Sequence, residues 1–401
     1  MTQVHIDSLT LRGCTQQNTI DNVISTTLDS SDSLDPAISH TALIVHETKI
    51  DILSSYFVNF SGLLWQSSVV ENHTKLQHIQ VGGAIVSSRS SVWIHKSVFK
   101  RNTAQLGGAV YAESGSNIKI TNCTFLDHNT TCRQKKCYGG VIFLDTSKAE
   151  ATACTFQNNA VVGTTKHIFG GVVGAFWSNM TINLSYFANN TASYGGAVHL
   201  RHCDVTMSKV VFVFNVAIYN GGAAFFKDCH DAIVIESRYV QNSAKLAGGG
   251  IWTQSSELFI VDSYFNENSA ITTGGAVKSD SMLSRSMTVN RSMFTSNRAH
   301  DGGALFTVKS RVMINMSAFM SNKATETGGA LFFVYSSVEC IGNITLTKNV
   351  AAFGASVFSH SVGSITGVVL VRQNIGSFLI FDSMVRIETK IDVIDNVLIK
   401  K

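Results

Sequence analysis

A pair of adjacent glycines recurs ten times along the chain, and this repeat constrains the fold more than any other feature. Successive pairs lie 25 to 32 residues apart, and Ala or Val follows most of them. A repeat of that length is typical of a solenoid, in which one short structural unit stacks on the next. The pairs begin at Gly82, Gly107, Gly139, Gly170, Gly195, Gly221, Gly248, Gly274, Gly302 and Gly328.

A second motif alternates with the glycine pairs: an aromatic residue that is followed three positions later by Asn. Apolar residues lie seven and five positions before the aromatic, as Val92 and Ile94 do before Phe99. Alternation with a period of two is typical of short β-strands with one buried face. The aromatic residues of the motif are Phe99, Phe156, Phe187, Phe212, Tyr239, Phe265, Phe294 and Phe319.

These two motifs predict an all-β fold, a parallel β-helix of about fourteen coils with three short strands in each coil. No segment has ten or more residues of helical periodicity, and a propeller blade needs about four strands in roughly 40 residues. Stacked coils place equivalent residues about 4.8 Å apart. We therefore expect the aromatic residues to form one interior column and the asparagines to form a hydrogen-bonded ladder.

The repeat also predicts how the chain is organised. We expect one elongated domain over residues 1–401. Because the first and last copies of the repeat begin and end within a coil, and solenoids usually carry capping units, we expect the domain to be part of a longer polypeptide. Loop excursions are predicted near residues 15–40, 61–80 and 129–138. Such loops on a rigid scaffold are where variable recognition is expected.

Composition argues against two classes of partner. The net charge of +4, the 14% of charged residues and the lack of a basic run argue against nucleic-acid binding. No apolar stretch reaches the roughly 18 residues that a membrane span needs. We predict no cofactor and no metal.

Two pairs of cysteines occupy equivalent positions in adjacent coils, and a third pair flanks an insertion. Adjacent coils lie about 4.8 Å apart, which is within the Cα–Cα range of a disulfide. For the first pair, a reduced interior stack that replaces Ser is an equal alternative. For the other two we favour disulfides, and hence an oxidising compartment. The pairs are Cys123–Cys154 in the interior column, Cys132–Cys137 around an excursion and Cys203–Cys229 at a turn.

Asn-x-Ser/Thr sequons occur at ten positions, but the repeat itself creates several of them, because it places Ser or Thr before the aromatic residue. Asn72 and Asn129 lie in predicted loops, and we expect these two to be the glycosylation acceptors. Both the sequons and the cysteines favour an extracellular or cell-surface location.

Over about residues 40–350 the two motifs resemble the repeats of the polymorphic outer-membrane proteins of chlamydiae and their β-helix relatives. The matching segments read GGAI at Gly82, GGAV at Gly107, Gly195 and Gly274, and GGAL at Gly302 and Gly328. The resemblance implies a right-handed parallel β-helix of the pectin-lyase-like kind, displayed at a cell surface and acting in adhesion. The expected partner is a cell-surface protein or a glycan.

The alternative is a polysaccharide lyase or glycosidase, because β-helices often carry these activities. Such an enzyme needs a pair of carboxylates or an acidic calcium cluster with a base. We find no such pair in the sequence, and we therefore expect a scaffold or adhesin without catalysis. One weaker candidate is a patch of histidines and aspartates on two consecutive coils, made of His199, His202, Asp204, Asp228, His230 and Asp231.

Overall fold

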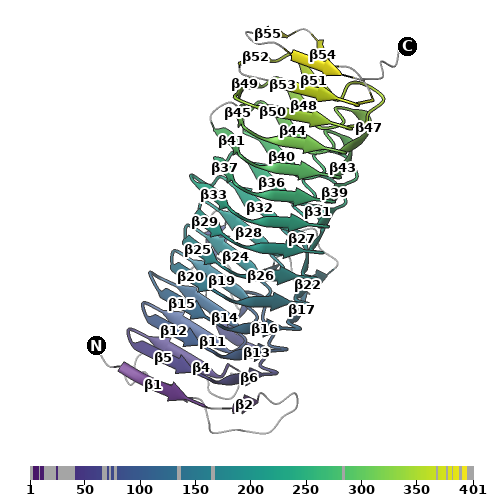
Figure 1. Cartoon of the computed structure of the whole chain (residues 1–401). Helices are drawn as coiled ribbons and strands as arrows, with labels where there is room; N and C mark the ends of the chain where they lie inside the picture. The colour runs from purple at the N-terminus through teal and green to yellow at the C-terminus, as the bar shows by residue number, and fades with distance from the viewer. Residues whose placement is uncertain are drawn as a thin grey trace. The chain divides into compact units, whose positions relative to one another are not determined.

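The structure is a computed structural model that describes residues 3–8, 10–12, 24–25, 41–65, 70–71, 74–75, 79–132, 137–163, 168–281, 285–366, 369–375, 378–381, 383–387 and 391–394. It contains two compact units, Met1–Asp204 and Val205–Lys401. Within each unit the described strands form long parallel sheets (Figure 1). Each unit is therefore a parallel β-helix, as the repeat predicts.

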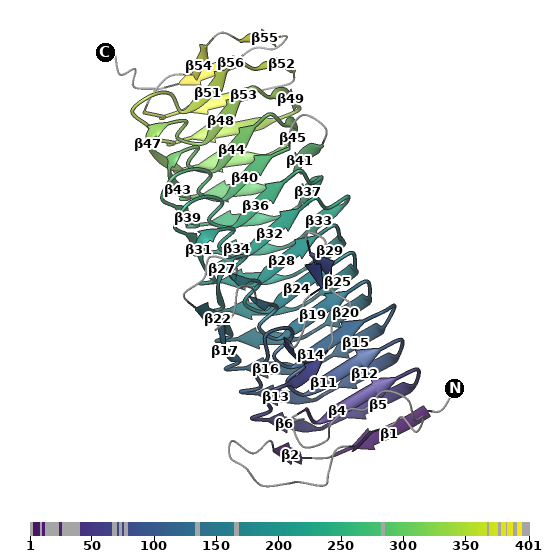
Figure 2. The same ribbon diagram turned by 180° about the vertical axis from the view of Figure 1, so that it is seen from behind.

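The strands of one coil belong to four different sheets in turn, which we number 1 to 4 from the glycine pair onward. Sheet 1 follows the glycines, sheet 2 carries the two apolar residues before the aromatic, and sheet 3 carries the aromatic residue. Sheet 4 follows the motif's Asn in many coils and corrects the expectation of three strands per coil. Its strands in the second unit, such as β31 (Val216–Asn220), are visible from behind in Figure 2.

The first unit builds its three main sheets from strands of two to five residues. Sheet 1 contains β3 (Ile24–Ser25), β4 (Leu43–His46), β11 (Ile85–Ser88), β14 (Val110–Glu113), β19 (Ile142–Asp145), β24 (Val173–Phe176) and β28 (Val198–Arg201). Sheet 2 contains β1 (Gln3–Asp7), β5 (Lys49–Leu53), β12 (Ser91–His95), β15 (Asn117–Thr121), β20 (Lys148–Thr152) and β25 (Asn179–Asn183). Sheet 3 contains β2 (Thr10–Arg12), β6 (Tyr56–Val58), β13 (Val98–Lys100), β16 (Thr124–Leu126), β21 (Thr155–Gln157) and β26 (Tyr186–Ala188).

Sheet 4 of the first unit contains β17 (Asn129–Cys132), β22 (Ala160–Gly163) and β27 (Thr191–Tyr194), with β18 (Cys137–Tyr138) pairing β23 (Ile168–Phe169). The predicted excursion at 129–138 is thus corrected: its described ends are strands of this sheet, paired with the next coil. Residues 61–80 contain two antiparallel pairs, β7 (Leu63–Trp65) with β10 (Ile79–Val81) and β8 (Val70–Glu71) with β9 (Thr74–Lys75). Apart from β3, the segment 15–40 lies outside the described residues.

The second unit repeats this plan. Sheet 1 contains β32 (Ala224–Lys227), β36 (Ile251–Gln254), β40 (Val277–Asp280), β44 (Leu305–Val308), β48 (Leu331–Val334), β51 (Ser356–Ser359) and β54 (Phe378–Phe381). Sheet 2 contains β29 (Asp204–Ser208), β33 (Ala232–Ile235), β37 (Leu258–Val261), β41 (Ser286–Asn290), β45 (Arg311–Asn315), β49 (Ser337–Ile341), β52 (Val362–Ile365) and β55 (Met384–Ile387). Sheet 3 contains β30 (Val211–Val213), β34 (Arg238–Val240), β38 (Tyr264–Asn266), β42 (Met293–Thr295), β46 (Ala318–Met320), β50 (Ile344–Thr347), β53 (Val369–Arg372) and β56 (Ile391–Ile394). Sheet 4 contains β31, β35 (Ser243–Ala244), β39 (Ser269–Ala270), β43 (Arg298–Asp301) and β47 (Lys323–Thr327).

Each coil needs glycine at both positions of the pair, and the reason differs between the two positions. The first glycine has a positive φ, +64° at Gly274 for example, which L side chains rarely adopt. The second glycine lies against the next coil, and a Cβ at Gly275 would collide with the carbonyl oxygen of Gly303. The repeat therefore needs glycine at both positions.

The interior column of aromatic rings is confirmed within each unit. In the first unit the rings stack from Phe57 through Phe99, Phe125 and Phe156 to Phe187, with centroids 4.6 to 4.9 Å apart. In the second unit Phe212, Tyr239, Phe265, Phe294 and Phe319 stack at 4.6 to 4.9 Å. All of these side chains are fully buried. The column is the center of the core.

The asparagine ladder is confirmed as well. In the second unit each amide nitrogen donates to the amide oxygen of the next coil at 2.9 to 3.0 Å, from Asn215 to Asn374. The same amide groups also donate to backbone carbonyls, as Asn268 does to Tyr239. Buried amides are thus satisfied by one another and by the turn backbone.

The structure shows the reduced alternative for the first cysteine pair, and it corrects the disulfide that was predicted for the third. Cys123 and Cys154 are buried thiols whose Sγ atoms donate to the carbonyls of Thr121 and Thr152, both at 3.3 Å. Ser97 makes the equivalent bond one coil earlier, so the thiols replace serine in this column. Burial raises the pKa of Cys123 to about 12 and that of Cys154 to about 11, because it desolvates the thiolate.

Cys203 and Cys229 also carry thiols, which corrects the prediction of a bridge between them. Each donates to the carbonyl two residues earlier, Cys203 to Arg201 at 3.2 Å and Cys229 to Lys227 at 3.5 Å. Ser178 makes the same bond at the equivalent turn, so these thiols replace serine too. In contrast, Cys132 and Cys137 form a disulfide with a Cα–Cα distance of 5.9 Å.

Candidate ligand-binding surface

The predicted histidine and aspartate patch divides between the two units. In the first unit, His199 is buried with its ring 4.6 Å from Phe169, whereas His202 stacks on Trp177 at a centroid distance of 5.2 Å. The two histidines therefore pack against different aromatic residues, and Asp204 is exposed at the start of β29. Within this unit the predicted residues are not gathered into one site.

In the second unit, two residues of the same patch form an ion pair. The Nδ1 atom of His230 lies 3.3 Å from a carboxylate oxygen of Asp231, and the His230 side chain is 68% exposed. Asp228 occupies a turn with a φ of +53°. Exposed ion pairs of this kind stabilise a fold only weakly. This arrangement fits a solvated turn.

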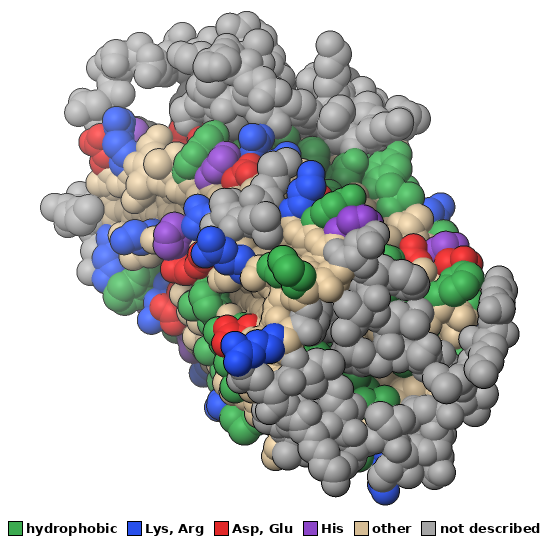
Figure 3. Space-filling model, turned by 90° about the horizontal axis from the view of Figure 1, so that it is seen from above, with side chains coloured by type: hydrophobic (Ala, Val, Ile, Leu, Met, Phe, Trp, Pro, Cys, Tyr) green, Lys and Arg blue, Asp and Glu red, His purple; other side chains and the backbone are tan. Residues whose placement is uncertain are grey.

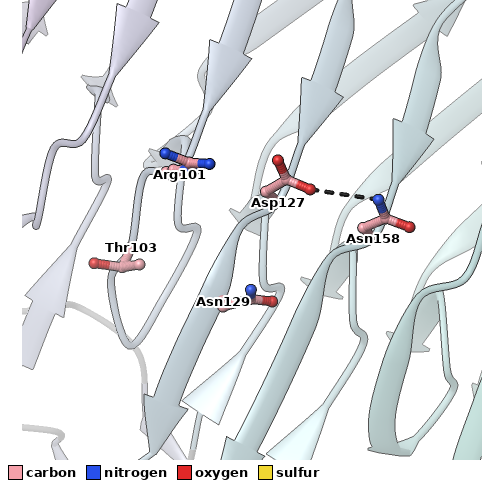
Figure 4. Close-up of a pocket in the computed structure, with 5 residues that line it drawn as sticks. All are labelled: Arg101, Thr103, Asp127, Asn129 and Asn158. Carbon is pink, nitrogen blue, oxygen red and sulfur yellow. Dashed lines mark hydrogen bonds between the residues drawn. The ribbon is translucent and has the colours of Figure 1, made fainter.

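A surface hollow of about 490 Å³ in the first unit is a stronger candidate (Figure 4). Sequence reasoning missed it, because its residues are up to 57 positions apart and only the stacking of coils brings them together. Five polar side chains line the hollow: Arg101, Thr103, Asp127, Asn129 and Asn158. The hollow thus offers a guanidinium, a hydroxyl, a carboxylate and two amides.

The fold places these side chains through one repeated corner. Arg101, Asp127 and Asn158 follow β13, β16 and β21 directly, and each has a φ between +54° and +57°. A left-handed residue ends the sheet 3 strand and turns the chain, so the same corner recurs in consecutive coils. These three side chains therefore lie in a row on the surface, as the labelled sticks in Figure 4 show.

The electrostatics of the hollow center on one carboxylate. Asp127 accepts a 3.4 Å hydrogen bond from Asn158 Nδ2 (Figure 4), and Lys100 Nζ lies 3.8 Å away on the other side. Asn189 in turn donates to Asn158 at 3.4 Å. The hollow is thus a donor and acceptor array with little net charge, which suits a ligand rich in hydroxyl groups.

Directly beneath the hollow, the asparagine ladder contains a histidine. His128 is fully buried, its Nδ1 lies 3.0 Å from Asn159 Oδ1, and its Nε2 lies 3.4 Å from Asn102 Nδ2. Burial lowers the pKa of His128 to about 4, although the hydrogen bond that its ring donates to Asn159 opposes the shift. The sequence signal for this position was the His that replaces the motif's Asn three residues after Phe125.

Two carboxylates that the sequence keeps apart lie side by side on the outer face of sheet 1. Ala112 pairs with Leu144, so the residues that follow them, Glu113 and Asp145, are neighbours on adjacent strands. Both are 5% exposed, and Glu113 accepts a 2.7 Å hydrogen bond from the hydroxyl of Tyr111. Sequence inspection missed this pair, because 32 residues separate its members.

In the second unit, the same face of sheet 1 carries aromatic residues around a lysine. The Trp252 and Phe225 rings stack at 4.2 Å, and Lys278 Nζ lies 6.0 Å from the Trp252 ring and 5.6 Å from the Phe306 ring. Burial lowers the pKa of Lys278, while nearby Asp280 opposes the shift. These are favourable cation–π contacts that stabilise the face.

Of the predicted glycosylation acceptors, Asn72 lies outside the described residues. Asn129 is exposed, and so is Thr131, which completes its sequon. Asn129 begins β17 and does not lie in a loop. Its side chain lines the hollow.

A family model described as a right-handed beta helix region matches residues 61–226. The parallel pairing of the strands in the long sheets agrees with the fold that this family model describes. The fold is a right-handed parallel β-helix. No curated protein matches the chain.

Two solved structures align with the chain at low identity. Tailspike protein 3 of bacteriophage CBA120 aligns over 88% of this chain with 11% identity and a TM-score of 0.41, and the chain spans 57% of that protein. The periplasmic alginate epimerase AlgG aligns over 89% of this chain and 77% of its own, with 10% identity and a TM-score of 0.34.

Two further observations bear on the expected partners. Among the described residues, no helix is long and apolar enough to cross a membrane. On the face shown in Figure 3, basic and acidic side chains are interspersed and do not gather into a patch of one sign.

Proposed function

We propose that the protein is a non-catalytic β-helix module of the cell surface or extracellular space that binds a glycan in the hollow formed by Arg101, Thr103, Asp127, Asn129 and Asn158. The observation that carries the proposal is this set of side chains. Donors and acceptors converge there on a rigid corner of the helix. Sugar hydroxyls both donate and accept hydrogen bonds, so a mixed array of this kind complements them.

The hollow favours binding over catalysis. Glycoside hydrolysis uses two carboxyl groups on either side of the scissile bond. Asp127 is the only carboxylate among the lining residues, and its neighbours are an amide and a lysine. Nothing in this set pairs a general acid with a second carboxylate.

The cell-surface location is supported by the Cys132–Cys137 disulfide. Disulfides persist mainly in oxidising compartments. Both cysteines are buried in a small core beneath sheet 4, with Val161, Ile168 and Ala192. The bridge thus holds the strand that begins at Asn129, and with it one wall of the hollow.

A glycan array at pH 7.4 tests the proposal. Arg101→Ala and Asn158→Ala should each lower the signal of the bound glycans at least tenfold. Lys348→Ala is the matched control, because Lys348 is a basic residue at the same corner in the second unit, with a φ of +56°. Equal signals for all variants would refute the hollow as the site, and capture of a protein ligand alone would refute a glycan.

A second candidate function rests on the Glu113 and Asp145 pair. Adjacent carboxylates on the outer face of a β-helix are the groups that a carbohydrate-active enzyme would use for acid–base chemistry. Incubation with polygalacturonate, alginate and mixed glycans should release no reducing or unsaturated ends if the first proposal is right. Turnover that Glu113→Gln and Asp145→Asn abolish, but Arg101→Ala does not, would establish the enzyme instead.

A further inference from the structure

The hollow lies directly over the histidine in the ladder. Its lining residues are the chain neighbours of three consecutive ladder residues. Arg101 and Thr103 flank Asn102, Asp127 and Asn129 flank His128, and Asn158 precedes Asn159. A movement of one of these three buried side chains therefore shifts the residues that line the hollow, because only one peptide bond separates them in the chain.

Hydrogen bonds fix the tautomer of neutral His128, that is, which of its two ring nitrogens carries the proton. Asn159 Nδ2 donates to the carbonyl of Phe125 and to Asn190 Oδ1, so Asn159 Oδ1 faces His128 and can only accept. The proton of the neutral ring therefore sits on Nδ1. The Nε2 lone pair then accepts from Asn102 Nδ2. Neutral His128 satisfies the ladder on both sides.

A second proton would break this arrangement. It would turn Nε2 into a donor that faces the donor Asn102 Nδ2 at 3.4 Å, and Asn102 Nδ2 is already held by the Phe57 carbonyl. The charged residues that lie within two positions of these three ladder residues in the chain are Lys100, Arg101 and Asp127. Asp127 favours the protonated ring, but Lys100 lies 3.8 Å from its carboxylate. The charged ring must therefore move out of its position between Asn102 and Asn159, or the backbone around it must shift.

We propose that His128 is a pH-sensitive positioning residue for the hollow: its protonation in acid displaces Asp127 and Asn129 and weakens ligand binding there. The other described members of the ladder are asparagines, which do not titrate. The weakening of binding rests on the proposed glycan site. The displacement of the two wall residues does not, and it is measured separately.

The displacement is tested by NMR of the whole chain in an Asp127→Asn background, which removes the titration of the carboxylate itself. Between pH 7 and 4 the side-chain amide signals of Asn129 and Asn158 should shift or broaden, and those of Asn322 in the second unit, which donates to a carbonyl and to an amide oxygen, should not. His128→Asn restores the motif residue, and in that variant all three should stay fixed. Equal shifts with and without His128 would overturn the proposal.

The effect on binding is tested by repeating the glycan array at pH 4.0 with its uncharged glycans, which do not titrate. Because about half of the His128 rings are protonated at that pH, the fall in the wild-type signal from pH 7.4 should be about twofold larger than the fall in the His128→Asn signal. A parallel fall in both proteins would refute the coupling. Without any glycan binding at pH 7.4 the proposed function fails, and the NMR result alone then decides the role of His128.

Discussion

At the scale of single residues, burial in a stacked column decides which chemistry a side chain keeps. A cysteine in a serine column is not a nucleophile, because the column desolvates its thiolate and gives its hydrogen to a carbonyl. Cys123 illustrates this with a pKa raised to about 12. The sequence placed Cys123 and Cys154 in one column, but position alone did not distinguish a bridge from a hydroxyl substitute.

The thiol assignment predicts the pattern of alkylation. Iodoacetamide on the native protein at pH 8 should leave Cys123, Cys154, Cys203 and Cys229 unmodified, because all four are buried thiols. After unfolding without reductant, all four should react, while Cys132 and Cys137 should react only after reduction. A non-reducing peptide map that links Cys203 to Cys229 would contradict this assignment.

The aromatic column predicts a large loss on truncation of one ring. Phe265 is fully buried between Tyr239 and Phe294, with centroids 4.6 and 4.8 Å away. Phe265→Ala should lower the free energy of unfolding by about 3–5 kcal/mol, because the stacked neighbours cannot fill the cavity. Phe214→Ala is the control: its side chain is 49% exposed, and a change within about 0.5 kcal/mol is expected. Denaturant unfolding measures both.

At the scale of elements, the sequence predicted the strands that carry the repeated apolar pattern, and it missed the strands and corners that carry no such pattern. The strands of sheets 1 to 3 were predictable, because their apolar alternation recurs in every coil. Sheet 4 was not, because its strands are as short as two residues, such as Ser243–Ala244 and Ser269–Ala270, and carry no alternation. The left-handed corners were not predictable either, since residues as different as Trp177, Leu184 and Arg101 occupy them.

The ladder is the element that holds the corners in place, and its loss can be measured. Asn268 accepts from Asn242 and donates to both Tyr239 and Asn297. Asn268→Ala leaves these buried groups without a partner, so it should cost about 3 kcal/mol or more, at roughly 1–3 kcal/mol per orphaned group. Gln241→Ala removes an exposed amide at the preceding corner and should change stability by less than about 0.5 kcal/mol. Equal midpoints in urea would contradict the role of the ladder.

At the scale of the whole molecule, the surface chemistry is set by which coils are neighbours. Arg101 and Asn158 line one hollow although they are two turns of the helix apart, and Glu113 lies beside Asp145 because their coils are adjacent. Fold prediction needed only the repeat. Prediction of these sites also needed the register between adjacent coils. Insertions of several residues between glycine pairs make that register hard to read from the sequence. Of the predicted histidine patch, His230 and Asp231 form an ion pair in the second unit, whereas His199 packs against aromatic residues in the first.

The stability of the whole molecule should depend on pH through His128. Its pKa is about 4 in the folded state, against 6.5 for an ordinary histidine. Below pH 6.5 the unfolded chain binds a proton that the folded chain does not, so stability falls as the pH drops and the loss is complete near pH 4. The full difference corresponds to about 3 kcal/mol. Urea unfolding of wild type and His128→Asn at pH 7, 6, 5 and 4 measures it, because the other titrating groups are common to both. A constant difference between the two proteins across this range would show that His128 is protonated equally in both states.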